Sequence, residues 1–573
     1  MSSIINKRWF IRPTPEPEIL SSLQRALGIS PLFARLLSNR GIQTPEQAHA
    51  FLKPSLEDLE SPWALKNMDR AVALVKQNIA ERKKILIWGD YDVDGTTGAS
   101  LLYSVLSKIG ADVSTYIPHR IHEGYGLSLT GLQKAIQGDV SLLITVDCGV
   151  TARKEIEYVA SKGIQTIVVD HHEPQADKWP SQAVVINPLQ PGCPSSYKYL
   201  TAVGLAFKLA WALIGREAFE HVELVAAGAV ADIAPLTGEN RILVREGLER
   251  INTNPRAGFK ALLESAGAGQ KKIDASHFGF VIGPRINASG RMSSAETALK
   301  LLMTQEIGEA RELAQVLEQA NRTRQQVERE TLRQAIQKVT EQVDFKESSV
   351  IIVEDERWHP GVIGIVASRL VERFYRPSIV IAMNQGRGKG SGRSIRNFHL
   401  VSALEQCQEV LEEFGGHRQA AGLTVTQENL PLFKETFNRV AQQRLKPEDF
   451  IPLLEADCEI SLKDLNAGLL KDLDRLAPYG CGNPKPVFIS SGLFLKSPPQ
   501  FMGKNTVKFW VTDHAQIYQA VGFGMGDRFL NGGKSDFNPS ASLHLAYSPR
   551  LHEWQGETSL ELVLEDFRFF HSA

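Results

Sequence analysis

The sequence predicts an α/β protein with a doubly wound parallel-sheet domain, a long connecting helix, a second and smaller α/β domain, and a C-terminal β-barrel of the OB type. Three observations lead to this fold class. Strand-like and helix-like segments alternate between residues 84 and 170, a proline-free helical pattern runs from Glu306 to Gln342, and short β-type segments follow residue 450. At 573 residues, the chain is also too long for a single hydrophobic core.

The first 62 residues are expected to form an N-terminal arm that lies on a larger body. Six prolines fall between residues 13 and 54, and Glu18–Leu27 is one short helical piece among them. A doubly wound sheet domain is expected over residues 63–300. Its strands and helices are expected, in order, at 84–89 (strand), 96–109 (helix), 112–117 (strand), 129–136 (helix), 142–146 (strand), 151–162 (helix) and 165–170 (strand).

Three further parts complete the expected organisation. Residues 301–345 form a connecting helix about 50 Å long, unless that helix simply packs on one domain. Residues 346–447 form the second α/β domain, with strands at 349–353 and 378–382 around a helix at 362–374. Residues 448–573 form the barrel, with strands expected at 486–495, 506–512, 516–523, 541–547 and 559–564.

Composition and charge are those of an ordinary globular protein. Hydrophobic residues make up 43% of the chain, and 64 Lys and Arg balance 65 Asp and Glu for a net charge of −1. That balance argues against nonspecific coating of nucleic acid but leaves room for a local basic groove. The five cysteines are widely spaced, which favours a reducing compartment and excludes a zinc ribbon. With no signal peptide and no apolar run of ~18 residues, we expect a cytoplasmic protein without a membrane partner.

Three apolar runs in the first α/β domain each end on an aspartate: Asp90, Asp147 and Asp170. Such runs are typical of strands buried on both faces of a parallel sheet, and ligands bind just outside the carboxyl ends of these strands. Two histidines, His171 and His172, follow the third aspartate. Because so much negative charge would repel itself if left unpaired, the sequence predicts a bound divalent cation, or a pair of them, at this edge.

The segment Asp90–Gly95 reads D-x-D-x-D-G, which resembles the start of a calcium-binding EF-hand loop. That loop needs an acidic residue at its twelfth position, where this chain has Leu101. We instead expect a tight strand-to-helix turn, eased by Gly95 and Gly98, that aims Asp92 and Asp94 at the sheet edge. A mixed carboxylate and imidazole shell favours Mn²⁺ or Mg²⁺ over zinc.

Three more features bear on the metal site. Asp147 could bridge two cations from its strand end. The side chains of His171 and His172 are expected to diverge because the residues are adjacent, so that one binds metal and the other contacts substrate. Asp232 ends an apolar helix, where it is either a further ligand or a hydrogen-bond acceptor.

Two hard cations held close together suit the hydrolysis of a phosphoester. No G-x-S-x-G nucleophile motif and no Walker A loop competes with this interpretation. A second candidate site is the glycine-rich run that holds Arg387, Lys389, Arg393 and Arg396, which we expect to be a phosphate-binding loop. Its alternative is a solvated basic loop.

The motifs together resemble those of the DHH phosphoesterases. The four that carry the metal residues are Gly89–Gly95 (G-D-Y-D-V-D-G), Val146–Gly149 (V-D-C-G), Val169–Pro174 (V-D-H-H-E-P) and Ala231–Leu236 (A-D-I-A-P-L). The match continues through Gly283–Arg291, Trp358–Gly364, Gly390–Ser394, Phe414–His417 and Pro478–Pro484, of which Phe414–His417 marks a DHH-associated domain. The layout resembles that of the bacterial single-strand-specific 5′→3′ DNA exonucleases of this family.

The resemblance implies an enzyme that degrades single-stranded DNA to mononucleotides in repair and recombination, with two Mn²⁺ or Mg²⁺ ions activating water near an anchored 5′ end. The implied metal ligands are Asp90, Asp92, Asp94, Asp147, His171 and Asp232. Asp147, His171 and His172 are the implied catalytic residues. The residues implied to hold DNA phosphates are Arg120, Arg291, Ser391, Arg393, His359, His417 and Arg418.

The family also implies partners, namely a single-strand-binding protein and a RecQ-type helicase, and a monomeric enzyme. Two other functions stay open. A DHH phosphoesterase could act on short oligonucleotides, cyclic dinucleotides or pyrophosphate, although such substrates need neither the barrel nor the extra length. A non-catalytic DNA-binding scaffold could share the fold, although it would not need the metal ligands, all of which are present.

Overall fold

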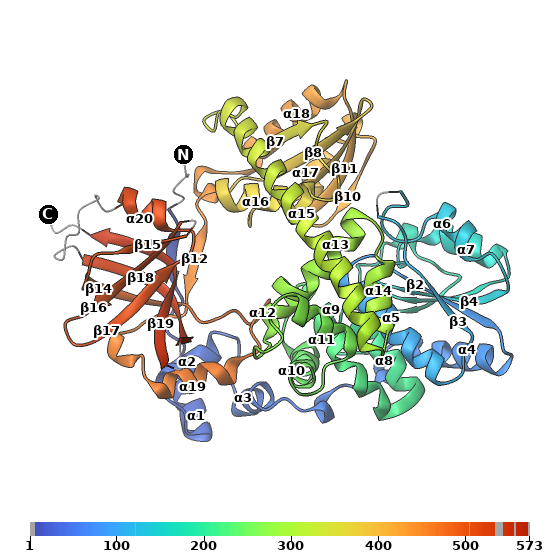
Figure 1. Cartoon of the computed structure of the whole chain (residues 1–573), viewed down its shortest axis with the longest axis horizontal. Helices are drawn as coiled ribbons and strands as arrows, with labels where there is room; N and C mark the ends of the chain where they lie inside the picture. The colour runs from blue at the N-terminus through green and yellow to red at the C-terminus, as the bar shows by residue number, and fades with distance from the viewer. Residues whose placement is uncertain (1–5, 121, 504, 533–541, 555–556, 571–573) are drawn as a thin grey trace. The chain divides into compact units, whose positions relative to one another are not determined.

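The structure, a computed structural model, describes residues 6–120, 122–503, 505–532, 542–554 and 557–570 (Figure 1). The chain divides into two compact units. One contains Lys53–Val327 and Pro478–Pro484, and the other contains Met1–Leu52, Glu328–Ala477 and Lys485–Ala573. The long helix expected from Glu306 to Gln342 is present as α15 (Ile307–Gln342), and the division between the units falls within it.

The first unit contains a parallel sheet of five strands in the order β3-β2-β4-β5-β6. Their bounds are β2 Lys84–Gly89, β3 Val113–Tyr116, β4 Val140–Val146, β5 Gln165–Val169 and β6 Val184–Ile186. The first four match the expected strands, whereas the three-residue β6 was not expected from the sequence. The predicted doubly wound parallel sheet is therefore confirmed.

Helices cover both faces of this sheet, as Figure 1 shows. On one face, α4, α5 and α8 pack on strand residues such as Ile85 and Ile87. On the other face, α6 and α7 pack on the alternate residues, including Leu86 and Trp88. Because successive strand residues point to opposite faces and both faces are covered, the central strands β2, β4 and β5 are mostly apolar on both faces.

The helices of this unit begin and end as follows: α4 Met68–Ala80, α5 Val93–Lys108, α6 Leu129–Ala135, α7 Arg153–Ser161, α8 Ala202–Ile214, α9 Val222–Ala231, α10 Gly238–Thr253, α11 Ala257–Ser265, α12 Ala275–His277, η5 (a π-helical turn) Phe278–Ile282, α13 Gly283–Met292 and α14 Glu296–Met303. Helix α5 begins three residues before the expected start, because Asp92 caps its first turn.

The second unit contains another five-stranded sheet, in the order β10-β11-β9-β8-β7. Strands β7 (Ile351–Asp355) and β8 (Ser378–Asn384) are parallel, and β9 (Arg387–Arg393), β11 (Ala420–Thr426) and β10 (Glu413–Gly416) continue the sheet antiparallel. Helices α16 (Ile363–Phe374), α17 (Leu400–Glu405) and α18 (Leu430–Arg444) belong to the same part of the chain.

The expectation that the glycine-rich basic run is a loop is wrong for Arg387–Arg393, which form the strand β9; only Arg396 lies in the turn that follows. Its glycines alternate with polar residues, and a Cβ at Gly388 or Gly390 would lie 2.6 Å from Ile381 or 2.7 Å from Leu423. The glycines therefore face the side of the sheet that packs on α17 and α18, and the side chains of Arg387, Lys389 and Arg393 point to the opposite side. The strand thus presents these three basic residues at fixed spacing.

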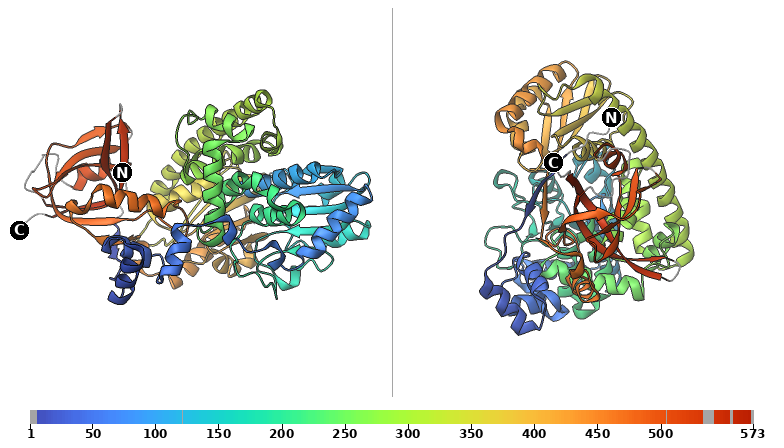
Figure 2. Two further views of the ribbon diagram at one scale, coloured as in Figure 1. Left: turned by 90° about the horizontal axis from the view of Figure 1, so that it is seen from below. Right: turned by 90° about the vertical axis from the view of Figure 1, so that its left-hand side faces the viewer.

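The C-terminal strands close into a barrel. The order is β13-β14-β18-β19-β17-β16-β15, and an additional pairing between β14 and β16 completes the ring. The two turned views in Figure 2 show these strands curving around a common axis. The bounds are β13 Cys458–Glu459, β14 Phe488–Leu495, β15 Gln500–Met502, β16 Thr506–Thr512, β17 Ile517–Gly522, β18 Ser542–Trp554 and β19 Glu557–Phe570, with helices α19 Ala467–Leu476 and α20 Gly526–Gly532. Strands β18 and β19 are longer than expected, and the expected start at Ala541 lies outside the described residues.

The N-terminal segment belongs to this second unit. Its strand β1 (Arg8–Ile11) pairs in parallel with β12 (Leu453–Ala456), and helices α1 (Pro17–Leu27), α2 (Pro31–Ser38) and α3 (Pro45–Leu52) follow. The indole nitrogen of Trp9 donates a hydrogen bond to Asp566 of β19 at 2.6 Å. Residues 1–5 of the expected arm lie outside the described residues. Within the described ranges, no helix is both long and apolar enough to span a bilayer.

Candidate metal centre and phosphate-binding residues

Asp90, Asp147 and Asp170 follow the carboxyl ends of the neighbouring strands β2, β4 and β5. The backbone N–H of each aspartate donates to a carbonyl of the next strand in the sheet, at 3.0 to 3.2 Å. These bonds extend the parallel ladder by one residue and hold the three carboxylates at one edge. The order of strands in the sheet therefore brings together residues that are up to 80 positions apart.

The backbone of Asp147 adopts an unusual conformation. Its φ angle is +66°, in the left-handed region that residues with a Cβ rarely occupy. Such a conformation costs on the order of 1 kcal/mol or more and is held only where the surroundings fix it. Gly149, two residues later, has a φ of +113° and completes the turn. The chain accepts local strain here, and the strained residue carries a buried carboxylate.

The turn after β2 places two further carboxylates. The side chain of Asp92 accepts a hydrogen bond from the Gly95 N–H at 3.1 Å and so caps α5. A Cβ at Gly95 would lie 2.5 Å from the backbone of Asp90, so this close turn requires glycine. Asp94 accepts hydrogen bonds from two backbone N–H groups at the start of α8, at 2.7 and 2.9 Å. Asp94 is thus both part of the acidic cluster and an anchor for that helix.

The acidic and histidine side chains at this edge form three overlapping groups whose ligand atoms lie within 4.8 Å of one another. The groups are Asp147 with His171 and His172, Asp94 with His171 and Asp232, and Asp90 with Asp92 and Asp147. Asp147 is shared by two groups, and so is His171. Asp232 follows the last residue of α9, and its side chain is one-third exposed.

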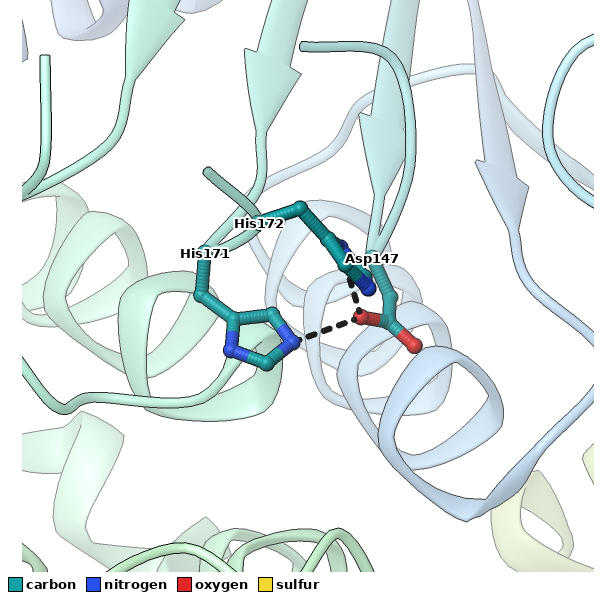
Figure 3. A group of neighbouring side chains, drawn as sticks. All are labelled: Asp147, His171 and His172. Carbon is teal, nitrogen blue, oxygen red and sulfur yellow. Dashed lines mark ion pairs between the residues drawn. The ribbon is translucent and has the colours of Figure 1, made fainter. Parts of the chain in front are cut away.

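The expectation that the two histidine side chains diverge is wrong. Their ring centroids are 4.6 Å apart, and both rings face Asp147, as Figure 3 shows. His171 Nε2 lies 3.2 Å from Asp147 Oδ1, and His172 Nδ1 lies 3.9 Å from the same oxygen. The rings converge because the chain after β5 turns instead of continuing extended, so the alternation of a strand does not apply.

The carboxyl groups of the cluster hold protons more tightly than usual. Burial, followed by repulsion from Asp92, raises the pKa of Asp94 to about 7 and that of Asp90 well above its ordinary value. Burial also raises the pKa of Asp147 well above its ordinary value, with neighbouring carboxylates adding to the effect. Burial and the charge of Asp94 raise the pKa of Asp232 to about 8. The cluster therefore needs positive charge nearby in order to ionise fully.

The chemistry of the donor set fits a hard divalent cation. Among the described side chains, Asp90 Oδ1 and Asp147 Oδ1 are buried oxygens that accept no hydrogen bond. A buried carboxylate oxygen that accepts no hydrogen bond is costly, and a cation bound by carboxylate oxygens would satisfy both. Carboxylates with one or two imidazoles are the ligands that Mn²⁺ and Mg²⁺ accept.

Asp170 was expected at the same sheet edge but was given no role as a metal ligand or catalytic residue. Burial opposes ionisation of Asp170, yet its hydrogen bond to His172 and the charges of both histidines lower its pKa. Asp170 Oδ1 lies 2.7 Å from His172 Nδ1, and Asp170 Oδ2 accepts the Val150 N–H at 2.9 Å. Despite burial, the same contact raises the pKa of His172 to about 9. The place of Asp170 at the end of β5 was visible in the sequence, whereas its contact with His172 is visible only in the structure.

Two of the expected phosphate-binding residues lie beside the turn after β2. The guanidinium carbon of Arg120 is 4.7 Å from the centre of the Tyr91 ring. Arg291 is in the last turn of α13, and its neighbour Gly290 lies so close to the Tyr91 carbonyl that a Cβ there would be 3.1 Å from it. The structure therefore places Arg120 and Arg291 around Tyr91, next to the acidic cluster.

The other expected phosphate-binding residues belong to the second unit. Ser391 and Arg393 face the same side of β9, and Arg393 Nη1 donates to Ser391 Oγ at 3.2 Å. Both lie against the start of α16, where a Cβ at Gly364 would be 2.9 Å from Ser391 Oγ and 3.2 Å from Arg393 Nη2. A hydroxyl, a guanidinium and a helix N-terminus in one place are the elements of a phosphate site.

His359, His417 and Arg418 lie in the loops around this sheet. The side chain of His359 accepts the Gly361 N–H at 3.0 Å just before α16, and burial lowers the pKa of His359. His417 and Arg418 are exposed in the turn between β10 and β11. Two members of the basic run form ion pairs with acids distant in sequence: Arg387 with Glu412, and Arg396 with Glu455 at 2.8 Å.

Comparison with known proteins identifies the family to which this architecture belongs. Models of three protein families match the chain: the DHH family N-terminal domain over residues 84–232, the DHHA1 domain over 347–443 and the RecJ OB domain over 456–566. The single-stranded-DNA-specific exonuclease RecJ of Bacillus subtilis is 37% identical over 98% of this chain and 70% of its own length. RecJ of Escherichia coli is 32% identical over 94% of this chain and 96% of its own.

Solved structures agree with these matches. The crystal structure of RecJ from Thermus thermophilus in complex with Mn²⁺ superposes with a TM-score of 0.83 at 32% identity, covering 99% of this chain and 80% of that one. The same protein in complex with Mg²⁺ gives a TM-score of 0.78. With the parallel sheet, the acidic edge, the DHHA1 domain and the OB barrel in the same order, the chain belongs to the RecJ family of DHH-type, single-stranded-DNA-specific exonucleases.

Proposed function

We propose that this chain is a metal-dependent 5′→3′ exonuclease that degrades single-stranded DNA to mononucleotides in repair and recombination. The single observation that carries the proposal is the acidic edge of the parallel sheet, with its two buried carboxylate oxygens that accept no hydrogen bond among the described residues. Membership of the RecJ family supplies the substrate class.

Two Mn²⁺ or Mg²⁺ ions are the proposed cofactors. Asp90, Asp92 and Asp147 would hold one ion, and Asp94, His171 and Asp232 would hold the other, with Asp147 near enough to His171 to contact both. When bound, such ions lower the pKa of a coordinated water and neutralise charge on the phosphate.

His172 is the proposed residue for contact with the scissile phosphate. Asp170 engages His172 Nδ1 at 2.7 Å, which fixes the orientation of the ring beside the acidic cluster. In the metal-free protein, the contact with Asp170 raises the pKa of His172 to about 9 despite burial, and a cationic ring suits contact with a phosphate oxygen. In this scheme Asp147, His171 and His172 are the catalytic residues.

The phosphates of the strand are proposed to be held in both units. Arg120 and Arg291 would bind phosphate beside the acidic cluster, and Ser391 and Arg393 would bind it at the start of α16. His359, His417 and Arg418, which lie in the DHHA1 domain, are also proposed to bind phosphates of the strand. The OB barrel offers a further surface for single strands.

The test is digestion of an internally labelled single-stranded oligonucleotide in Mn²⁺, with the 5′ end and the 3′ end blocked in turn. Wild type is expected to release mononucleotides, to stop when the 5′ end is blocked, and to spare blunt duplex. Asp147→Ala should abolish cleavage, whereas Asp139→Ala, a matched change at an exposed aspartate of the same unit, should retain it.

Two outcomes would replace the proposal. Wild type that binds the strand but cleaves nothing would indicate a DNA-binding scaffold. Wild type that cleaves only substrates of two to five nucleotides would indicate an oligonucleotide phosphodiesterase.

We also propose that the enzyme acts as a cytoplasmic monomer together with a single-strand-binding protein and a RecQ-type helicase. The free, widely spaced cysteines support a reducing compartment. Stimulation of digestion by each purified partner, and the mass of the enzyme in solution, would test these points.

A further inference from the structure

Tyr125 occupies a place beside the acidic cluster that the proposed mechanism does not use. It lies between Gly124 and Gly126, whose φ angles of +83° and +77° are in the left-handed region. The two glycines fold the chain tightly on both sides of the tyrosine, and a Cβ at Gly126 would be 3.8 Å from Cys148, the residue after Asp147. The side chain of Tyr125 is half exposed, although its hydroxyl is engaged within the site.

The Tyr125 hydroxyl contacts two residues of the proposed catalytic group. It donates a hydrogen bond to the backbone carbonyl of Asp147 at 2.9 Å. The same oxygen lies 3.2 Å from each ring nitrogen of His172, and the two rings meet edge to face with centroids 5.7 Å apart. Since the only hydroxyl hydrogen points to the Asp147 carbonyl, the oxygen presents its lone pairs to His172.

These contacts complete a set of restraints on His172. Asp170 holds Nδ1 at 2.7 Å, and the Tyr125 hydroxyl lies against the ring. Rotation of the ring would break contact with one or the other. The bond to the Asp147 carbonyl also supports the one residue of the cluster whose backbone lies in the left-handed region, where an external contact is needed to hold it.

The Tyr125 ring also contacts the residue that holds Arg120. Tyr91 meets Tyr125 edge to face, with centroids 6.5 Å apart and an interplanar angle of 79°. Arg120 then lies over the other ring of this pair, 4.7 Å from the Tyr91 centroid. A continuous series of contacts therefore runs from a proposed phosphate-binding arginine, through two tyrosines, to the proposed catalytic histidine.

We propose that Tyr125 is a positioning residue, which holds His172 and the backbone of Asp147 through its hydroxyl and aligns Arg120 through the Tyr91 ring. The inference rests on the proposed function, because it assigns Tyr125 to the same reaction. Tyr125 acts through these neighbours and not by binding metal. The hydroxyl of Tyr125 thus affects the rate of the reaction through His172 and Asp147, and its ring affects binding of the strand through Tyr91 and Arg120.

The proposal predicts different results for loss of the hydroxyl and loss of the ring. Tyr125→Phe is expected to lower kcat about ten-fold at saturating single-stranded DNA, with KM changed less than two-fold, because one oriented hydrogen bond is lost. Tyr125→Ala should lower kcat further and also raise KM several-fold. Tyr518→Phe, which removes a hydroxyl bonded to the Leu465 carbonyl in the barrel, is the matched control and should keep kcat unchanged.

A double-mutant comparison tests whether the hydroxyl acts through His172. In a His172→Ala background, adding Tyr125→Phe should change the residual rate less than two-fold. An equal ten-fold loss in both backgrounds, or an unchanged kcat in Tyr125→Phe, would overturn the proposal. A fall in the melting temperature of Tyr125→Phe comparable to that of Tyr125→Ala would also contradict it, by indicating a purely structural role.

A second readout does not depend on activity. In protein labelled with ¹⁵N-histidine, Tyr125→Phe should shift the side-chain resonances of His172, identified by their loss in His172→Ala, and leave those of His49 in place. Unshifted His172 resonances would overturn the proposal. If wild type cleaved no single strand, the proposed function would fail, while these spectra would still decide whether Tyr125 positions His172.

Discussion

The metal-free protein should lose stability as pH rises, because folding buries carboxylates that the sheet edge keeps from ionising. The pKa of Asp94 moves from its ordinary 3.8 to about 7 in the folded protein, with burial as the main cause. Those of Asp90 and Asp147 also rise well above the ordinary value. At any pH between the ordinary pKa of such a carboxyl group and its raised pKa in the folded protein, the folded state therefore binds more protons than the unfolded state.

The sign and size of the effect follow directly. For a carboxyl group whose pKa is raised by folding, the stabilisation is complete below about pH 4 and is lost as pH rises through the folded pKa. A rise of about three units at Asp94 corresponds to about 4 kcal/mol, of which water entry would recover part. Between pH 5 and pH 8, the unit that contains the parallel sheet should lose several degrees in its unfolding temperature.

Divalent metal should reverse this trend, because it binds the ionised carboxylates. We expect Mn²⁺ or Mg²⁺ to raise the unfolding temperature more at pH 8 than at pH 5.5, since protons compete with the metal at low pH. Calorimetry in EDTA and in Mn²⁺ across this range measures both effects. Asp147→Asn should flatten the slope of the metal-free protein, whereas Asp139→Asn, at an exposed position, should leave it unchanged. A metal-free unfolding temperature that is constant or rises from pH 5 to pH 8 would refute the reasoning.

Three further predictions concern the turn, the helix anchor and the strand contacts. Gly95→Ala should abolish metal-dependent stabilisation and cleavage, because the alanine Cβ would lie 2.5 Å from the Asp90 backbone. The control is Gly308→Ala in α15, where the space around the residue is open. This change should be neutral or should stabilise the protein by up to about 1 kcal/mol in thermal unfolding. In metal-free protein at pH 5, where the pKa values of about 7 and about 8 keep Asp94 and Asp232 protonated, Asp94→Ala should be destabilising by about 1–3 kcal/mol through the loss of its bonds at the start of α8. Asp232→Ala, at a side chain that is one-third exposed, should change stability less, so equal unfolding temperatures would contradict the distinction. Binding of single-stranded DNA should weaken roughly 10³-fold between 50 and 200 mM salt if about six phosphates are contacted, and a flat binding constant would contradict that expectation.

The sequence alone determined the fold class and most of the acidic cluster. Runs such as Ile85–Trp88 and Ile167–Val169 are apolar on successive residues, which is typical of strands covered on both faces. Since ligands gather at the carboxyl ends of such strands, an aspartate after each run already indicated a shared site. Gly95 could be assigned to the turn for the same local reason. These features depend on residues that are adjacent in the chain, so they can be predicted from the sequence alone.

Tertiary structure decided what depends on residues distant in the chain. The partnership of Asp170 with His172, the contact of Tyr125 with both His172 and Asp147, and the anchoring of α8 by Asp94 all join separate elements. The basic run became a strand because its glycines pack against neighbouring strands that sequence spacing does not reveal. The local pattern predicted the element for most segments, but the partners, the pKa and the orientation of a side chain come from the elements that fold against it.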